Sequence, residues 1–204
     1  MRKPIVTTFL TLDGVMQAPG GPGEDDDGFA LGGWSVNYWD ELMNQTMGAF
    51  MGKPFDLVLG RKTYDIFAAY WPEAPEEAGG KPLNEATKYV ASRGNPTLEW
   101  SKSVLIEGDV AQGIAMLKRE DGPELQVHGS GNLIQTLMRQ GLVDQYVLWV
   151  FPLVVGSGKR LFADGIVPSA LKLVDSKVST TGVVIGTYAP AGEIVTGSFA
   201  LDSE

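Results

Sequence analysis

Two short stretches of the chain have residue types and spacing that suit anion binding. Gly60 and the cations Arg61 and Lys62 directly follow the apolar residues 57–59 and lead into a helical pattern that begins with Thr63. A helix N-terminus is electropositive, so two cations are unfavourable there unless an anion lies between them. We interpret the stretch as a phosphate site; the alternative is that both cations point to solvent.

A second glycine-rich turn lies between an expected strand and an expected helix, the usual arrangement for holding a pyrophosphate. It comprises Gly129, Ser130, Gly131, Asn132 and Leu133, and it lacks the third glycine of the dinucleotide fingerprint. Ser92 and Arg93 end another expected strand and supply a third patch that suits anions. Because strand ends in an open α/β sheet line one crevice, the three patches predict a dinucleotide with an extra phosphate, as in NADP.

Two carboxylates are candidate proton donors. Asp40 lies beside the apolar stripe of an expected helix over residues 36–51, and partial burial there would raise its pKa towards neutrality. Its alternative role is that of an acid suited to the helix dipole. Asp13 follows the first expected strand, and its alternative role is that of a turn residue.

Three further residues have both a functional and a structural interpretation. Trp71 could form a wall for a flat substrate or could simply pack. Lys159, with Arg160, could bind a second anion such as a sugar phosphate, or both could be surface cations. We expect His128 to be a core histidine bonded to backbone rather than a base.

Composition excludes several classes of function. The chain has 204 residues, no cysteine, one histidine and a formal net charge of −9. Disulfides, thiolate zinc sites and a cysteine nucleophile are therefore excluded, we expect no metal site, and binding of nucleic acid through a broad basic face is disfavoured. There is neither a signal peptide nor an apolar run long enough to span a membrane, so we expect a cytoplasmic protein of one domain, residues 1–204.

The elements that must position these residues alternate between strand and helix through most of the chain, which predicts a parallel sheet with crossover helices. Three final strands have no helix between them, and the last two form an antiparallel hairpin. The expected strands are 5–12, 57–59, 88–91, 103–106, 124–127, 143–155, 171–179 and 183–189, and the expected helices are 36–51, 61–69, 110–119 and 132–139. Residues 13–33, with the acidic run 24–27, form either a solvated loop or a lid, and residues 70–84 form another loop.

In this order the motifs resemble the dihydrofolate reductase superfamily, in particular its branch close to the C-terminal reductase domain of the riboflavin-biosynthesis deaminase-reductase. The resemblance covers roughly residues 4–189. It is carried by five stretches: Thr11-Leu12-Asp13-Gly14, Leu59-Gly60-Arg61-Lys62-Thr63-Tyr64, Tyr89-Val90-Ala91-Ser92-Arg93, Gly129-Ser130-Gly131-Asn132-Leu133, and residues 152–162.

The resemblance implies a mixed sheet with helices on both faces and NADPH as cofactor. The turn that begins at Gly60, with Arg61, Lys62, Thr63, Ser92 and Arg93, would hold the 2′-phosphate side. Residues 129–133 would hold the pyrophosphate. An ungapped count back from Gly60 places Asn44, not Asp40, at the position of the dihydrofolate reductase carboxylate.

The sequence thus predicts an NADPH-dependent oxidoreductase that reduces a small pterin-like, pyrimidine-like or carbonyl substrate by hydride transfer. The alternative from a different class is a non-catalytic module that binds a nucleotide or small molecule in the same cleft. A riboflavin-pathway reductase is a third option. We expect a small-molecule partner, neither nucleic acid nor membrane, and a homodimer as one candidate assembly.

Overall fold

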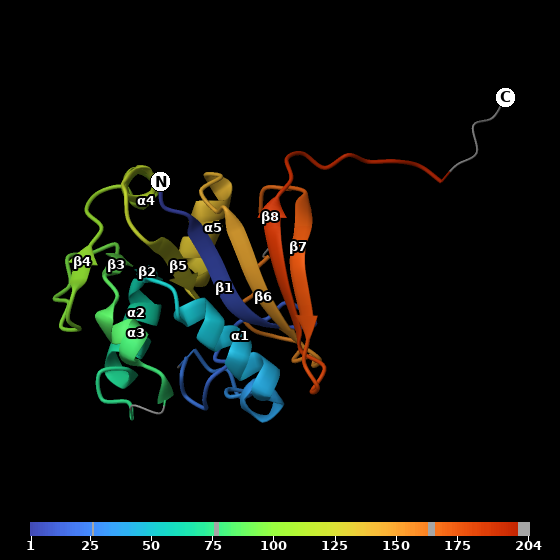
Figure 1. The fold of residues 1–204 in the computed structure, drawn as a ribbon, viewed down its shortest axis with the longest axis horizontal. Coiled ribbons are helices and arrows are strands. Elements are labelled where there is room, and N and C mark those ends of the chain that lie inside the picture. The colour runs from blue at the N-terminus through green and yellow to red at the C-terminus, as the bar shows by residue number, and fades with distance from the viewer. Residues whose placement is uncertain (26, 76–77, 163–165, 200–204) are drawn as a thin grey trace.

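One sheet organises the chain. The computed structural model describes residues 1–25, 27–75, 78–162 and 166–199, so Asp26 of the acidic run lies outside the described residues. Within them, eight strands form a sheet of order β4-β3-β2-β5-β1-β6-β8-β7 (Figure 1). The strands are β1 (Pro4–Thr11), β2 (Phe55–Gly60), β3 (Lys88–Ala91), β4 (Ser103–Leu105), β5 (Glu124–His128), β6 (Gln145–Phe151), β7 (Leu171–Val178) and β8 (Val184–Pro190).

The sheet is mixed, which confirms the predicted fold class. All pairs from β4 across to β6 are parallel, and β8 pairs antiparallel with both β6 and β7. Helices lie between consecutive parallel strands except β3 and β4, and none lies between the last three strands among the described residues. The carboxyl ends of β1, β2, β3, β5 and β6 therefore meet at one edge of the sheet.

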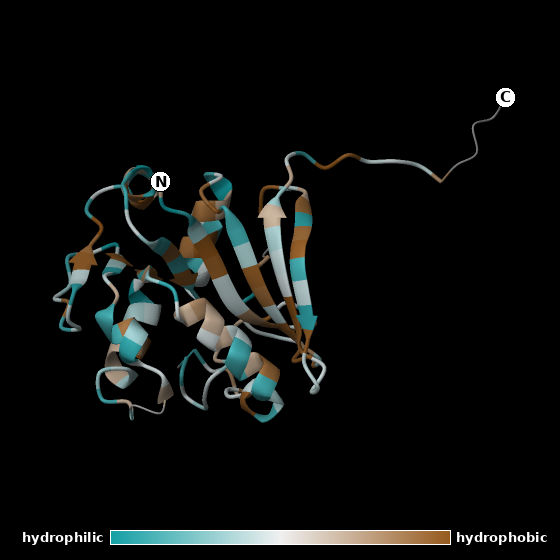
Figure 2. Ribbon diagram, viewed as in Figure 1, coloured by the Kyte–Doolittle hydropathy of each residue, from teal (hydrophilic) through white to brown (hydrophobic). Residues whose placement is uncertain are grey.

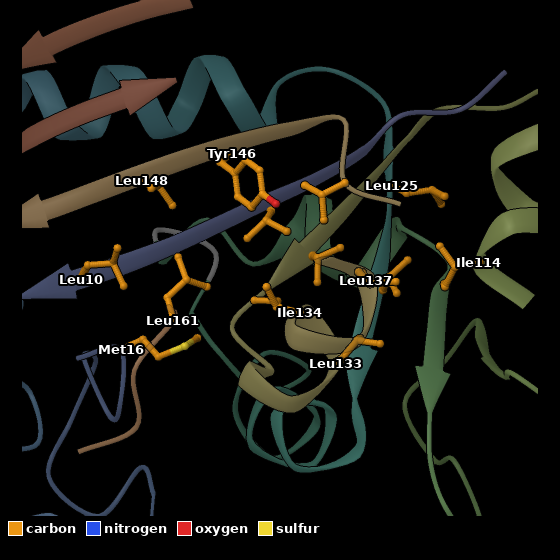
Figure 3. Packing of buried hydrophobic residues seen from close by; sticks show 14 of the residues in the cluster. Leu10, Met16, Ile114, Leu125, Leu133, Ile134, Leu137, Tyr146, Leu148 and Leu161 are labelled. Carbon is orange, nitrogen blue, oxygen red and sulfur yellow. The ribbon is translucent and has the colours of Figure 1, made fainter. Parts of the chain in front are cut away.

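Helices cover both faces of the sheet, because side chains alternate along each strand. Val58 of β2 packs in a cluster with α4 (Val110–Arg119) and α5 (Gly131–Arg139), and Figure 3 shows much of this cluster. Leu57 and Leu59 instead pack with α2 (Arg61–Tyr70) and α3 (Lys81–Glu85). A third cluster joins α1 (Glu41–Met51) to β6 and β8. Figure 2 shows hydrophobic residues along the central strands.

Three expected boundaries are wrong. The helix predicted over 36–51 is interrupted: Val36–Tyr38 form a short 3-10 helix, Trp39 and Asp40 are extended, and α1 begins at Glu41. Asp40 ends the extended stretch because its carboxylate caps α1, accepting the N–H of Met43 at 2.9 Å. The loop expected over 70–84 contains the start of α3, where Pro82 suits a first helical turn. The strand expected over 143–155 ends at Phe151.

The stretch expected as a loop, residues 13–33, has little regular structure but is well anchored. Val15 forms an isolated antiparallel bridge with Arg160, and both Val15 and Met16 are buried. The indole N–H of Trp34 donates to the carbonyl of Gln17 at 2.8 Å. The first part of the stretch, residues 15–18, therefore packs against the sheet's carboxyl edge, whereas Leu31 is 52% exposed. Elsewhere, no helix of the described residues is both long and apolar enough to cross a membrane.

Candidate functional site

The two predicted phosphate-binding turns lie side by side at the carboxyl edge. Strands β2 and β5 are neighbours, and the helices that follow them begin next to one another. The N–H of Gly60 donates to Oγ of Ser130 at 2.8 Å, which ties the two turns together. Ser130 has φ +66° and Gly129 φ +52°, so the backbone before α5 runs through two left-handed residues. The geometry thus unites residues that are about 70 positions apart.

Both helix starts are open to a ligand. Neither α2 nor α5 has a side-chain cap, so the first-turn N–H groups of residues 61–63 and 131–133 remain available to an anion. A Cβ on Gly60 would lie 3.2 Å from Oγ of Ser130, so a glycine keeps the two turns close. A Cβ on Gly131 would contact Sδ of Met16 at 3.5 Å.

The third predicted patch lies at the same edge. Gly60 of β2 is paired with Ala91 of β3, so Ser92 and Arg93 follow directly beside the start of α2. Arg93 is exposed, and no hydrogen bond or ion pair to it is found among the described residues. Ser92 accepts the N–H of Gly94 at 3.2 Å. Arg93 is therefore a cation available to a ligand at this edge.

The cations of α2 are already paired within the chain. Arg61 donates from Nε to both carboxylate oxygens of Asp65 at 2.7 Å, one turn along the helix. Lys62 Nζ lies 2.5 Å from Asp25 and 3.0 Å from Asp27. Thr63 lies beside the second turn, since its Oγ1 is 3.7 Å from the place of a Cβ on Gly129. Neither Arg61 nor Lys62 simply points to solvent.

The same two carboxylates also bind Lys159. Its Nζ lies 2.7 Å from Asp25 and contacts Asp27 as well. Hydrogen bonds from Lys159 and Lys62 lower the pKa of Asp27 to about 2. The sequence pattern does not predict this pairing. Its one signal is the acidic run 24–27 in a glycine-rich loop, and the two lysines lie far apart in the sequence.

Asp13 holds two loops together. Thr11 Oγ1 donates to it at 2.5 Å, and the N–H groups of Val155 and Gly156 donate at 3.3 and 2.9 Å. The Thr11 hydroxyl and these N–H groups lower the pKa of Asp13. Arg160 lies 3.4 Å from the same carboxylate. The carboxylate thus links the end of β1 to residues 155–160, and its lowered pKa does not suit a proton donor near neutrality.

The pKa expected for Asp40 is wrong in direction. Its carboxylate accepts the N–H of Met43 and both the N–H and Oγ1 of Thr180, the latter two at 2.8 Å. These bonds, with that from Met43 first, lower its pKa despite some desolvation. The expectation failed because Asp40 lies before the helix rather than within its apolar stripe. Nearby, Asn44 accepts the indole N–H of Trp39 at 2.5 Å.

Two aromatic residues occupy structural positions. Trp71 directly follows α2 and makes edge contacts with Phe67 and Tyr70, and its carbonyl accepts an amide N–H of Asn84 at 2.9 Å. Its role as a substrate wall stays a prediction. His128 lies between Phe50 and Phe67, and its Nε2 is 3.0 Å from Oε1 of Gln126, a side chain rather than the expected backbone group.

One hollow lies beside this arrangement, and a second lies away from it. One of about 390 Å³ is lined by residues 27–31, Gln17, Ser157 and Gly158, directly beside Lys159. The other, of about 250 Å³, lies between α1 and strands β6 to β8, towards the opposite edge of the sheet. Within the described residues, no group of three or more acidic, histidine or cysteine side chains is placed to hold a metal ion.

The strand order and directions match the dihydrofolate reductase-like fold. Residues 2–185 match the family described as the RibD C-terminal domain, so the chain belongs to this family, which is of the reductase type. Among its relatives is YyaP of Bacillus subtilis (strain 168), which is 29% identical over 193 residues, covering 92% of this chain and 94% of YyaP.

Solved structures support the fold. A putative riboflavin biosynthesis protein from Shewanella sp. PV-4 has a TM-score of 0.65 at 19% identity, covering 93% of this chain and 99% of that one. A pyrimidine reductase-like protein from Corynebacterium diphtheriae has a TM-score of 0.58 at 12% identity, covering 94% and 93%. Dihydrofolate reductase from Enterococcus faecalis, in complex with NADP(H) and RAB-propyl, has a TM-score of 0.57 at 14% identity, covering 92% and 96%.

Proposed function

We propose that this protein is an NADPH-dependent reductase of a small heterocyclic or carbonyl substrate. The observation that carries the proposal is the Gly60–Ser130 hydrogen bond, which holds two uncapped helix N-termini side by side at one edge of the sheet. A dinucleotide pyrophosphate is the ligand that such a pair of N-termini suits, because each offers unpaired N–H groups and a positive dipole end.

The residues present fit NADPH rather than NADH. Arg93 lies beyond β3, next to the start of α2, where an NAD-selective site would carry an acid that binds the ribose hydroxyls. In this assignment Arg93 and Ser92 bind the 2′-phosphate, Gly60 to Thr63 approach the neighbouring phosphates, and residues 129–133 hold the pyrophosphate. When bound, the nicotinamide supplies the hydride, and the protein positions it and excludes water.

A binding module without catalysis remains the second candidate function, and one observation favours it. Both candidate acids, Asp13 and Asp40, have lowered pKa values because donors surround their carboxylates. Neither can donate a proton near neutral pH. For a reductase of this design, we therefore propose that a water molecule supplies the proton. Oxidation of NADPH with any pterin, pyrimidinone, quinone or aldehyde would separate the two functions.

The test is a titration of NADPH and of NADH, followed by tryptophan fluorescence. We expect NADPH to bind at least about tenfold more tightly, since a charge-assisted contact contributes about 1.5–3 kcal/mol. Arg93→Ala should remove most of this preference. Lys172→Ala, which removes an exposed cation on the remote strand β7, is the matched control and should preserve it. Equal affinities of the wild-type protein for the two cofactors would contradict the assignment.

A further inference from the structure

Two lysines and two aspartates from three separate parts of the chain form one cluster of charges. Lys62 comes from the first turn of α2, Lys159 from the loop after β6, and the aspartates from the segment between β1 and α1. Each lysine contacts both Asp25 and Asp27. Both lysine side chains stay about half exposed, at 51% and 47%. A ligand can therefore reach them from solvent.

This cluster of charges lies beside the N-termini of α2 and α5. Lys62 is the second residue of α2. The carbonyl of Lys159 accepts the N–H of Met16 at 2.8 Å, and Sδ of Met16 lies 3.5 Å from the place of a Cβ on Gly131, the first residue of α5. Leu161, two residues beyond Lys159, packs in the same cluster as Met16 and Leu133 (Figure 3). Asp25 and Asp27 thus connect a lysine at the start of α2 with one beside the start of α5.

We infer that Lys62 and Lys159 form a single phosphate site, and that Asp25 and Asp27 occupy it as an internal competing anion. The inference rests on the proposed function, because the phosphate concerned is one of the two in the NADPH pyrophosphate. Two close carboxylates present several negatively charged oxygens to two ammonium groups, as a phosphate does. Asp25 and Asp27 therefore compete with the cofactor for the two lysines.

The ion pairs between the lysines and the aspartates are weak enough for a pyrophosphate to displace the aspartates. Both lysines are about half exposed and Asp27 is 57% exposed, so their ion pairs contribute little to stability because solvent screens them, whereas Asp25 is 11% exposed. A pyrophosphate held at the same place would gain the first-turn N–H groups of both helices as well as the lysines. The ligand therefore makes contacts that the aspartates do not make, and it can replace them.

Hydrogen bonds within residues 19–35 hold the segment that carries Asp25 and Asp27 close to the site. The carboxylate of Glu24 accepts the N–H groups of Gly20 and Gly21 at 2.6 and 3.2 Å. Ser35, at the end of the same segment, donates from Oγ to the carbonyl of Pro19 at 2.8 Å. These bonds fold the segment without using either lysine. Removing the charges of Asp25 and Asp27 should therefore free the lysines and leave the segment folded.

The experiment measures binding of NADPH and of inorganic pyrophosphate by calorimetry. The variant is Asp25→Asn combined with Asp27→Asn, and Asp27→Asn alone is the milder version because that side chain is 57% exposed. The matched control, Glu120→Gln with Asp121→Asn, removes two negative charges at the exposed end of α4, before β5 and so at the opposite edge of the sheet. Circular dichroism checks that each variant is folded.

We expect both variants to bind both ligands more tightly than the wild type, by about three- to tenfold for the double variant, with little change in the control. NADPH affinity that is unchanged or weaker in the folded variants overturns the inference and leaves the proposed function standing. Tighter pyrophosphate binding with no NADPH binding in any form overturns the proposed function and keeps the anion site. No binding of either ligand overturns both.

Discussion

At the scale of single residues, the environment of each titratable side chain decides its chemistry. Asp13, Asp27 and Asp40 are surrounded by hydroxyls, backbone N–H groups or ammonium groups, and all three pKa values are lowered. The surroundings of His128 are apolar instead. It lies among aromatic rings, and burial lowers its pKa to about 4. The aspartates therefore stay charged near neutrality, whereas the histidine stays neutral.

The neutral state of His128 predicts how stability depends on pH. An unfolded chain protonates His128 with a pKa of about 6.5, whereas the folded chain does so only near pH 4, so stability falls as pH drops through this window. Between pH 7 and pH 5 we expect His128 to reduce the free energy of unfolding by about 2 kcal/mol. Urea unfolding at the two pH values measures this loss.

The comparison with His128→Gln isolates the contribution of the histidine. Glutamine can keep a hydrogen bond to Gln126 but does not titrate in this range. The lowered pKa values of the aspartates affect stability at more acidic pH. If His128→Gln loses as much stability as the wild type over the same interval, the histidine is not buried in its neutral form.

At the scale of elements, Asp40 connects a helix to a hairpin. One oxygen accepts the N–H of Met43 at the start of α1, and the other accepts two bonds from Thr180 in the turn between β7 and β8. Thr181 in the same turn donates to the carbonyl of Tyr38 at 2.5 Å. The start of α1 and the turn of the hairpin thus stabilise one another.

Removing this connection should reduce stability more than a helix cap alone would. Asp40→Ala deletes the cap and the acceptor for Thr180, and we expect the free energy of unfolding to fall. Asp40→Asn keeps an oxygen that can cap α1, so its free energy of unfolding should fall by less. Chemical denaturation of the three proteins gives the values. Equal stability of Asp40→Ala and wild type would show that the carboxylate is not structural.

At the scale of the whole molecule, the two edges of the sheet differ. The edge strand β4 has three residues, whereas the edge strand β7 has eight and is exposed along most of its length. Leu173, Val174 and Val178 of β7 are 58%, 58% and 65% exposed. A long edge strand with apolar side chains is suited to pairing with another chain.

We therefore predict that the protein forms a homodimer through β7. Val174→Lys should place a charge in that interface and shift the protein to monomer, as measured by sedimentation velocity. Val104→Lys is the matched control, since Val104 is an apolar residue of β4 that is 47% exposed at the other edge. A monomeric wild type, or equal dissociation by the two substitutions, would contradict the prediction.

The sequence by itself determined the fold class and the placement of the two glycine-rich turns. The alternation of strands and helices predicted the parallel body and the antiparallel hairpin, and Gly60 and Gly129 marked strand ends because local turn chemistry is readable from neighbouring residues. Helix 36–51 was misread because the apolar period continues across Trp39 and Asp40, although their backbone is extended.

Only the tertiary structure decided which charges meet. Lys62 and Lys159 are almost one hundred residues apart, and the sequence pattern assigned them to different ligands, yet both contact Asp25 and Asp27. The same holds for Asp40 and Thr180, which lie far apart in sequence and meet at one turn. Periodicity reports what each element buries, whereas ion pairs and hydrogen bonds between loops depend on how the sheet brings distant strand ends to one edge.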